Sequence, residues 1–447
     1  MRTHMTIAKV KTKAEQSLIE WFDAVAAALP GDGWVANQRR EAIGMFAALG
    51  LPHRRLEAWK YTDLRMAMRE ALPPAGAARL DETRLAKALG PGLSRLEAVT
   101  FVFLNGRLAS WSHGPLVADH PGFTITPLGK ALANPDTALK AAFGRLTSLA
   151  GEAVVVLNTA FASDGAVIRI KAGAKLDVPL HIVAFSDLAA PAAMATRNLI
   201  DIGAGATITI LESHVGTNTV SSQTNHVSEI LLGAGATLDH VRVLNEGPAA
   251  LHVGSASLSV GAGATYRGFQ LTLSPGLARN QSFLTFAGEG GSVELNAAFL
   301  ARGIEHVDTT LVVDHAVPRC TSRELIKGVL DGEAKGVFQG KVLVRPNAQK
   351  TDGKQMAQAL MLSPLAEFDS KPELEIHADD VVCGHGSTSV EIDEEMLFYL
   401  RSRGIAEADA RALLIDAFIG DAIDRVRDDT IQAALRGLAA GWLKGAP

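Results

Sequence analysis

One cysteine and one histidine near the end of the chain are the residues best suited to metal chemistry. Cys383 and His385 stand two positions apart within residues 379–388. If this run is a strand, its side chains alternate between two faces, so the thiol and the imidazole project from the same side. A thiolate beside an imidazole suits an iron–sulphur cluster, copper or zinc. A buried cysteine is more commonly a small inert hydrophobic residue, and spacing alone favours that second interpretation.

Two glycines flank this histidine. Gly384 and Gly386 leave the positions around the imidazole bare, which lets another backbone or a cluster approach closely. The run that continues to Thr388 is rich in glycine but holds no lysine in a Walker A pattern. We therefore predict no phosphate-binding loop here.

The only other cysteine is Cys320. It could be a second thiol ligand, but a lone cysteine in a β-rich core is more often inert packing. We interpret the nearby pair Asp314 and His315 as structural residues as well. Two cysteines cannot supply the four thiolates of a closed cluster site, so this chain cannot complete such a site alone.

Composition narrows the class of protein. A chain of 447 residues is too long for one ordinary core, and its 5% aromatic content and 42 glycines favour short aliphatic strands joined by glycine turns. The net charge of −5 provides no general attraction for nucleic acid or anionic membranes. We find no disulfide framework, secretory signal or apolar run of membrane-spanning length. These features predict a soluble cytoplasmic protein.

A repeated turn sequence is the main architectural signal. Gly-Ala-Gly-Ala-Thr begins at Gly203, Gly233 and Gly261, and weaker copies occupy residues 172–175 and 289–292. Each strong copy follows a short aliphatic run and precedes another, with a period close to thirty residues. Such a period predicts a solenoid whose repeats bury their apolar faces against one another. An antiparallel sandwich need not reuse one turn sequence, so we reject it.

Two strands and two turns per repeat fit one coil of a parallel β-helix, which we place at residues 98–392. Known crossover preferences make a right-handed coil the default expectation. At its start, residues 99–104 favour a strand that ends at the turn pair Asn105-Gly106. A helical interlude is expected near 127–149.

Helical regions flank this core in the predicted organisation. Residues 1–97 form an N-terminal helical domain and linker, with helices around Leu18 to Leu29, stopped by Pro30, and from about 34 to 49. Residues 51–64, which combine aromatic and charged side chains, fit either a docking surface or, more readily, a packed junction between a helix and a loop. Residues 393–447 form a C-terminal helical domain.

Two amphipathic stripes in this last region could cap the solenoid or dock a partner. They comprise Ile415, Ile419, Ala422 and Val426, and Ile431, Leu435, Leu438 and Trp442.

Four segments resemble the SufB/SufD family of iron–sulphur cluster assembly proteins. They are residues 371–386, residues 397–405, residues 336–341 together with 348–352, and residues 59–62. The form Cys-x-His-Gly, with Gly386 where SufB tends to carry an acid, is most similar to SufD. Relatives usually carry a glycine within residues 389–391, where this chain has Ser-Val-Glu.

The resemblance implies a β-helix flanked by helical domains and working with SufB and the ABC-type ATPase SufC. It implies that Cys383 and His385 contribute to a transient iron–sulphur cluster shared with SufB, without catalytic turnover by this chain. It further implies ATPase docking through the C-terminal helices, from about Tyr399 to Trp442. Exposed strand edges at the end of the solenoid also predict a homodimer in isolation that exchanges for a heterodimer with SufB.

Two other functions compete with this interpretation. A β-helix enzyme acting on polysaccharides would need clustered catalytic groups along one face, and the threonine- and alanine-rich repeats supply no such cluster. A structural, self-assembling solenoid would leave Cys383 and His385 as spectators. Alanine substitution of both residues distinguishes this last function from a cluster scaffold.

Overall fold

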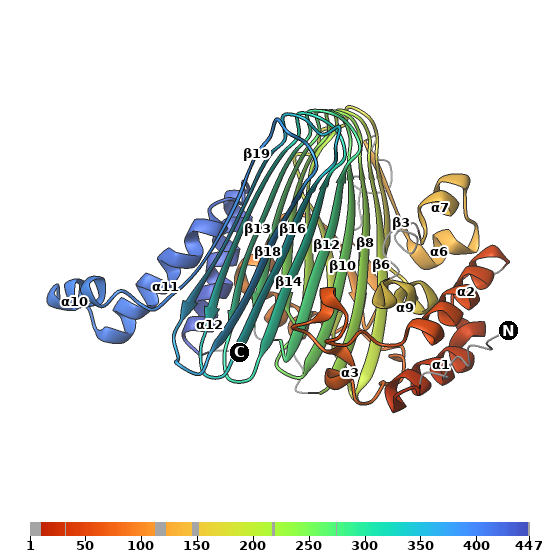
Figure 1. Ribbon diagram of the computed structural model, residues 1–447. Coiled ribbons are helices and arrows are strands. Elements are labelled where there is room, and N and C mark those ends of the chain that lie inside the picture. Colours follow the sequence, from red (N-terminus) through yellow and green to blue (C-terminus); the bar gives the residue numbers. More distant parts are fainter. Residues whose placement is uncertain are drawn as a thin grey trace, which may run out of the picture.

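The computed structural model describes residues 10–31, 33–111, 122–144, 152–216, 220–273 and 275–445. Its centre is a parallel β-solenoid, which confirms the fold class predicted from the repeats (Figure 1). Within the described residues, ten strands form one sheet and nine form the other, and from β4 onward successive strands alternate between the two.

The first sheet has the spatial order β19-β17-β15-β13-β11-β9-β7-β5-β1-β2. Its strands are β1 (Val99–Leu104), β2 (Arg107–Trp111), β5 (Leu180–Ser186), β7 (Thr207–Gly216), β9 (Thr237–Asn245), β11 (Thr265–Leu273), β13 (Ser292–Ala301), β15 (Thr321–Leu330), β17 (Asp352–Met361) and β19 (Val382–Val390). All pairings are parallel except the hairpin β1–β2. That hairpin turns at Asn105 and Gly106, both at positive φ, as the turn pair predicts.

The second sheet has the order β18-β16-β14-β12-β10-β8-β6-β4-β3. Its strands are β3 (Phe123–Pro127), β4 (Ala166–Ile170), β6 (Ala192–Ile202), β8 (Ser222–Leu232), β10 (Ala250–Val260), β12 (Leu277–Phe286), β14 (His306–His315), β16 (Lys335–Val344) and β18 (Glu367–Ile376). In this sheet the antiparallel pair β3–β4 stands at one end and β18 at the other.

The repeated Gly-Ala-Gly-Ala-Thr sequence forms the stacked turns between the two sheets. Gly205 takes φ 67°, a left-handed conformation that favours glycine. A Cβ on Gly203 would lie 2.5 Å from the amide nitrogen of Ala172 in the preceding turn, so stacking also requires glycine at this position. The Gly205 amide donates to Ala234 in the next turn at 2.8 Å, which links successive coils.

Inward-facing side chains form apolar ladders between the sheets near these turns. Ile208, Leu238, Tyr266 and Val293 occupy matching positions on β7, β9, β11 and β13, and all are buried. Full burial of a side chain of this size stabilises the fold by about 1.5–3 kcal/mol. In a single coil each of these side chains would be exposed on the two sides where its neighbours in the ladder now lie. The stability of one coil therefore depends on the coils next to it.

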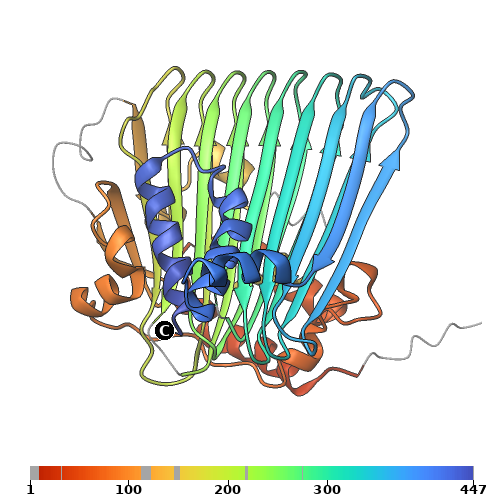
Figure 2. The ribbon, with the colours of Figure 1, turned by 90° about the vertical axis from the view of Figure 1, so that its left-hand side faces the viewer.

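Helices cover both outer faces of the solenoid (Figures 1 and 2). On the second sheet lie N-terminal elements and α9, whereas α4, α11 and α12 pack on the first sheet. The helices are α1 (Lys13–Val25), α2 (Trp34–Leu49), α3 (Leu64–Ala67), α4 (Glu82–Leu93), α6 (Leu128–Ala133), α7 (Thr137–Ala142), α9 (Ala153–Phe161), α10 (Glu394–Ser402), α11 (Glu407–Ile423) and α12 (Asp429–Leu443), with short 3₁₀ turns at Ala26–Ala28 and Glu57–Trp59.

Helices α6 and α7 occupy the expected interlude, and residues 145–149 of that interlude lie outside the described residues.

The segment around Trp59 joins the N-terminal region to the outer face of the second sheet. Trp59 is buried, and the guanidinium of Arg279 on β12 lies 3.9 Å from its ring centroid. Arg279 also forms a buried ion pair with Asp308 on β14, to which Thr62 donates a hydrogen bond. Trp59 and Thr62 therefore form a packed junction, whereas residues 54–58 and Lys60 are exposed.

The two C-terminal stripes pack against the solenoid. Ile415 and Ile419 on α11, and Ile431 and Leu435 on α12, are buried in one cluster with the outer face of the first sheet. These stripes therefore cover the solenoid, and the expectation that their apolar faces dock a partner is wrong. Helix α10 instead projects from the body of the molecule (Figure 1).

Candidate functional site

Cys383 and His385 lie on the last strand of the first sheet. In the parallel pairing of β19 with β17, Cys383 stands in register with Gly353 and His385 with Gln355. On β17 these two partners are buried, whereas Lys354 between them is exposed. Cys383 and His385 therefore continue the inward-facing ladders, on the same side of the strand as predicted.

The thiol of Cys383 is partly buried against the main apolar core. Its sulphur lies 3.6 Å from the position that a Cβ on Gly353 would take, so the glycine leaves room for it. Burial raises the pKa of Cys383, and the charge of Asp352 acts in the same direction against a hydrogen bond from Gly353. The group is thus a thiol at neutral pH, and metal binding must displace its proton.

His385 is exposed at the end of the solenoid. A Cβ on Gly384 would meet nothing within 4 Å, which agrees with the prediction of bare surroundings. The same prediction is wrong for Gly386, where a Cβ would lie 2.8 Å from the methyl carbon of Met356. Across the end of the solenoid, the hydroxyl of Ser387 donates to Ser370 on β18 at 2.7 Å.

Both sheets end at this point, because β18 and β19 are their terminal strands. Within the described residues, no further strand pairs with either edge. Val382 is 61% exposed and Val390 is 46% exposed. Uncovered strand edges of this kind favour pairing with another chain.

The outer face of β18 carries ion pairs. Lys335 lies 2.8 Å from Asp369, and Lys341 lies 2.5 Å from Glu375. Hydrogen bonds from Lys341 and His377 lower the pKa of Glu375 to about 2. The charged groups on the outer face are thus paired with one another. The thiol of Cys383 and the imidazole of His385 lie on the opposite, inward side of this edge.

Cys320 lies apart from the edge. It is fully buried, and its sulphur is 3.4 Å from the carbonyl oxygen of Pro318. It precedes β15, two strands from β19, which corresponds to about 10 Å along the solenoid. That separation excludes a single ion bound by both cysteines and agrees with a packing role.

His315 is also structural. It is buried inside the solenoid, its Nε2 lies 3.1 Å from the Ser322 hydroxyl, and burial lowers its pKa to about 4. Its neighbour Asp314 pairs with Arg345 at 3.0 Å on the surface.

Sequence reasoning missed a polar group inside the solenoid. One buried histidine stands on each of β7, β8, β9 and β10, accompanied by two buried glutamates: His214, His226, His240, His252, Glu212 and Glu246. The histidines recur every 12 to 14 residues, about half the repeat period. That recurrence is the signal that could have identified them.

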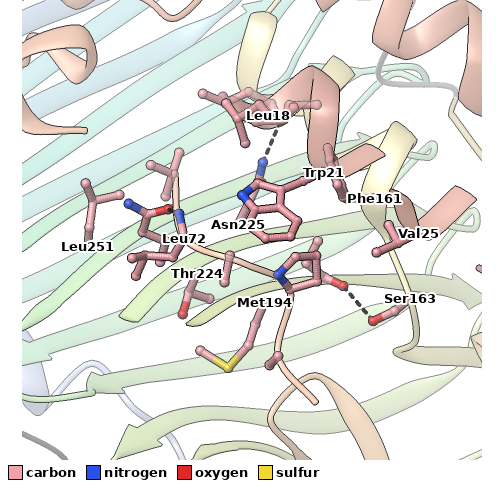
Figure 3. A pocket seen from close by; sticks show the side chains of 18 of the residues that line it. Leu18, Trp21, Val25, Leu72, Phe161, Ser163, Met194, Thr224, Asn225 and Leu251 are labelled. Carbon is pink, nitrogen blue, oxygen red and sulfur yellow. Dashed lines mark hydrogen bonds between the residues drawn. The ribbon is translucent and has the colours of Figure 1, made fainter. Parts of the chain in front are cut away.

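An apolar pocket of about 150 Å³ lies between the N-terminal helices and the second sheet (Figure 3). Leu18 and Trp21 line it from α1, and Met194 and Thr224 line it from the strands. None of the described residues lining it is a cysteine, histidine or carboxylate. The pocket therefore takes no direct part in metal chemistry.

Two family descriptions match most of the chain. "SUF system FeS cluster assembly, SufBD core domain" matches residues 185–418, and "SufBD protein N-terminal region" matches residues 12–182. In the part of the chain that the structure describes, helices long and apolar enough to cross a membrane are absent.

Known proteins resemble the chain along nearly its whole length. An iron–sulphur cluster assembly SufBD family protein of Synechocystis sp. is 32% identical over 420 residues, which cover 91% of this chain and 90% of that protein. The iron–sulphur cluster assembly protein SufD of Escherichia coli is 29% identical over 401 residues, which cover 88% of this chain and 90% of SufD.

Proposed function

Because this chain belongs to the SufBD family of iron–sulphur cluster assembly proteins, we propose that it is a SufD-type scaffold subunit of a cytoplasmic SUF complex. It acts with a SufB-type paralogue and a SufC-type ABC ATPase and has no catalytic turnover of its own. One observation carries the proposal. Cys383 and His385 project from the same face of a terminal strand that no described strand covers.

The ligand count supports a shared cluster. An iron–sulphur cluster needs four protein ligands, mostly thiolates. This edge offers one thiol and one imidazole, and Cys320 is buried two strands away. The partner chain supplies the remaining ligands, so the cluster is cargo that is released when the two chains separate or when an acceptor competes for it.

The strand edges support a partner solenoid at the same place. Pairing of β18 and β19 with the matching end of a SufB-type chain continues both sheets across the interface. Cys383 and His385 then lie at the contact. In the absence of that partner, the same edges pair with a second copy of this chain, giving a homodimer that exchanges for the heterodimer.

Helix α10 is the C-terminal element that supports ATPase docking. Phe398 is 73% exposed, and Met396 and Tyr399 are each 57% exposed. An amphipathic helix that presents such residues is suited to a groove on a partner. The apolar stripes of α11 and α12 are already buried, so docking uses α10 and the exposed surfaces of its neighbours.

Anaerobic co-purification tests the scaffold function. The chain is produced with its SufB-type and SufC-type partners, and iron, sulphide and visible absorption are measured per complex. We expect the double substitution of Cys383 and His385 by alanine to preserve the complex and abolish cluster formation. Cys320→Ala is the matched control for loss of a thiol and should retain the cluster. An unchanged cluster yield in the double variant would contradict the proposal.

A further inference from the structure

Inside the solenoid, the apolar ladders give way to a group of buried histidines and carboxylates. Glu212 and His214 follow Ile208 and Ile210 along the inward face of β7. His226 faces them from β8, and His252 lies on β10. The ring centroid of His214 lies 4.5 Å from that of His226 and 5.0 Å from that of His252, so His214 is at the centre.

The central histidine lacks the partner that burial demands. His214 is 6% exposed, and its Nδ1 has no hydrogen-bond partner in the described structure. An unsatisfied buried polar group costs about 1–3 kcal/mol, so a purely structural network would supply a partner.

The neighbours of His214 supply two further ligand atoms. One ligand atom each from Glu212, His214 and His226 lies within 4.8 Å of the others. His226 Nε2 is 3.3 Å from Glu212 Oε2, and its Nδ1 is held 2.8 Å from the Thr196 hydroxyl. This outer contact fixes the ring as in metal sites, where the second imidazole nitrogen is normally engaged.

A second triad shares His214, and in it His252 Nδ1 lies 2.7 Å from Glu246 Oε2. In the first triad, Glu212 is also paired: His240 Nε2 lies 3.3 Å from it and the Ser228 hydroxyl donates to it at 3.1 Å. The first triad is distinguished by a cavity of about 10 Å³ beside its two histidines, lined among others by His214, His226 and Asn198. A space of this size holds one water molecule or one ion.

We propose that Glu212, His214 and His226 bind one divalent first-row transition metal ion inside the solenoid. Two imidazoles and one carboxylate suit such ions and disfavour calcium or magnesium, which prefer oxygen ligands. The site is separate from the cluster-binding edge, since six strand spacings from β7 to β19 amount to roughly 29 Å. It therefore neither requires nor follows from the scaffold function.

The pocket in Figure 3 brings solvent close to this interior. Thr224 lines the pocket, and its hydroxyl donates to Glu246 Oε1 at 2.9 Å. Glu246 contacts His252, whose ring packs on that of His214. An ion entering through the pocket thus meets a carboxylate and an imidazole before it reaches the first triad.

Cobalt(II) is a suitable probe because its visible absorption reports nitrogen and oxygen coordination. A tag-free full-length chain is produced in medium containing Co²⁺, purified, and exchanged into EDTA, which strips ions from the exposed pair Cys383 and His385. We expect about one Co²⁺ per chain to remain, with ligand-field absorption and no thiolate charge-transfer band. Zn²⁺ should give the same stoichiometry.

Two isosteric variants assign the ligands. Glu212→Gln should lower the retained Co²⁺ by at least about tenfold, whereas Glu324→Gln, which changes a similarly buried carboxylate on β15 away from both triads, should retain it. A wild-type chain that retains no Co²⁺ overturns the proposal without reference to any variant. Equal losses in the two variants, or retention in Glu212→Gln, also overturn it. If Glu212→Gln does not fold, His226→Gln gives the same comparison.

Discussion

His385 lies in register with Gln355 on β17, so the exposed imidazole at the end of the solenoid stands over a buried amide. Gln355 in turn lies in register with the buried Glu324 on β15. The ladder beneath His385 is therefore polar. In contrast, Cys383 stands over Gly353 and packs against the apolar core. His385 thus rests on polar side chains and Cys383 on apolar ones. The two candidate ligands can therefore be tested separately.

We expect His385→Ala to lower cluster yield more than it lowers association with the SufB-type partner. An imidazole ligand is a point contact, whereas pairing of β18 and β19 is distributed along both strands. The measurement is paired: partner affinity by titration, and cluster yield by absorbance, for the wild type and the variant. Equal proportional losses in both would mean that His385 only packs the interface.

Glu324 makes stability depend on pH. Burial raises the pKa of its carboxyl from 4.5 to about 8, against an opposing contribution from Gln355. The folded chain then keeps a proton that the unfolded chain loses, so stability falls as pH rises between those two values and is level outside them. The total loss is at most roughly 5 kcal/mol.

Glu324→Gln should remove this contribution to the pH dependence and make the chain more stable than the wild type above about pH 8. Denaturant midpoints across this range measure the effect. Glu41→Gln on the exposed face of α2 is the control and should leave the slope unchanged. Buried His181 and His315, whose pKa values are lowered to about 3 and about 4, add the opposite slope below about pH 6.5, so the comparison is between the two chains. Equal slopes in the wild type and Glu324→Gln would refute the assignment to Glu324.

The coil could be predicted because its turns are chemically demanding. Gly203 and Gly205 are required by close stacking and positive φ, and the same requirement recurs in the next two turns, at Gly233 and Gly235 and at Gly261 and Gly263. The pair Asn105-Gly106 identifies its hairpin for the same reason. Local backbone geometry of this kind is visible in a single sequence.

Two features could not be predicted because they depend on contacts between coils. A stripe such as Ile415 and Ile419 shows that one helix face is apolar, but not whether the solenoid or another protein covers it. Likewise, His214 and His226 are brought together by stacking of separate strands. Cys383 and His385 were accessible to reasoning because they share one strand.

Breaking the buried pair of Arg279 and Asp308 should detach the N-terminal region from the solenoid. Asp308→Ala leaves a buried guanidinium without its carboxylate and removes the acceptor for Thr62, at a cost of about 3–5 kcal/mol. We expect a lower unfolding midpoint and faster proteolysis within residues 50–98. Glu70→Ala, which removes the exposed pair with Lys13, is the control and should change neither. Equal effects of the two substitutions would exclude this role.

Helix α10 provides the last prediction, because Met396, Phe398 and Tyr399 on it are exposed while the apolar stripes of α11 and α12 are buried. Phe398→Ala removes the most exposed aromatic ring of α10 and should weaken binding of the SufC-type ATPase by more than about tenfold, as expected for a central aromatic contact. Binding is measured by titration of the ATPase into the purified chain. Ile304→Ala is the matched control, since Ile304 is 85% exposed on the turn between β13 and β14. Loss of binding in the control, or full binding by Phe398→Ala, would show that the ATPase docks elsewhere.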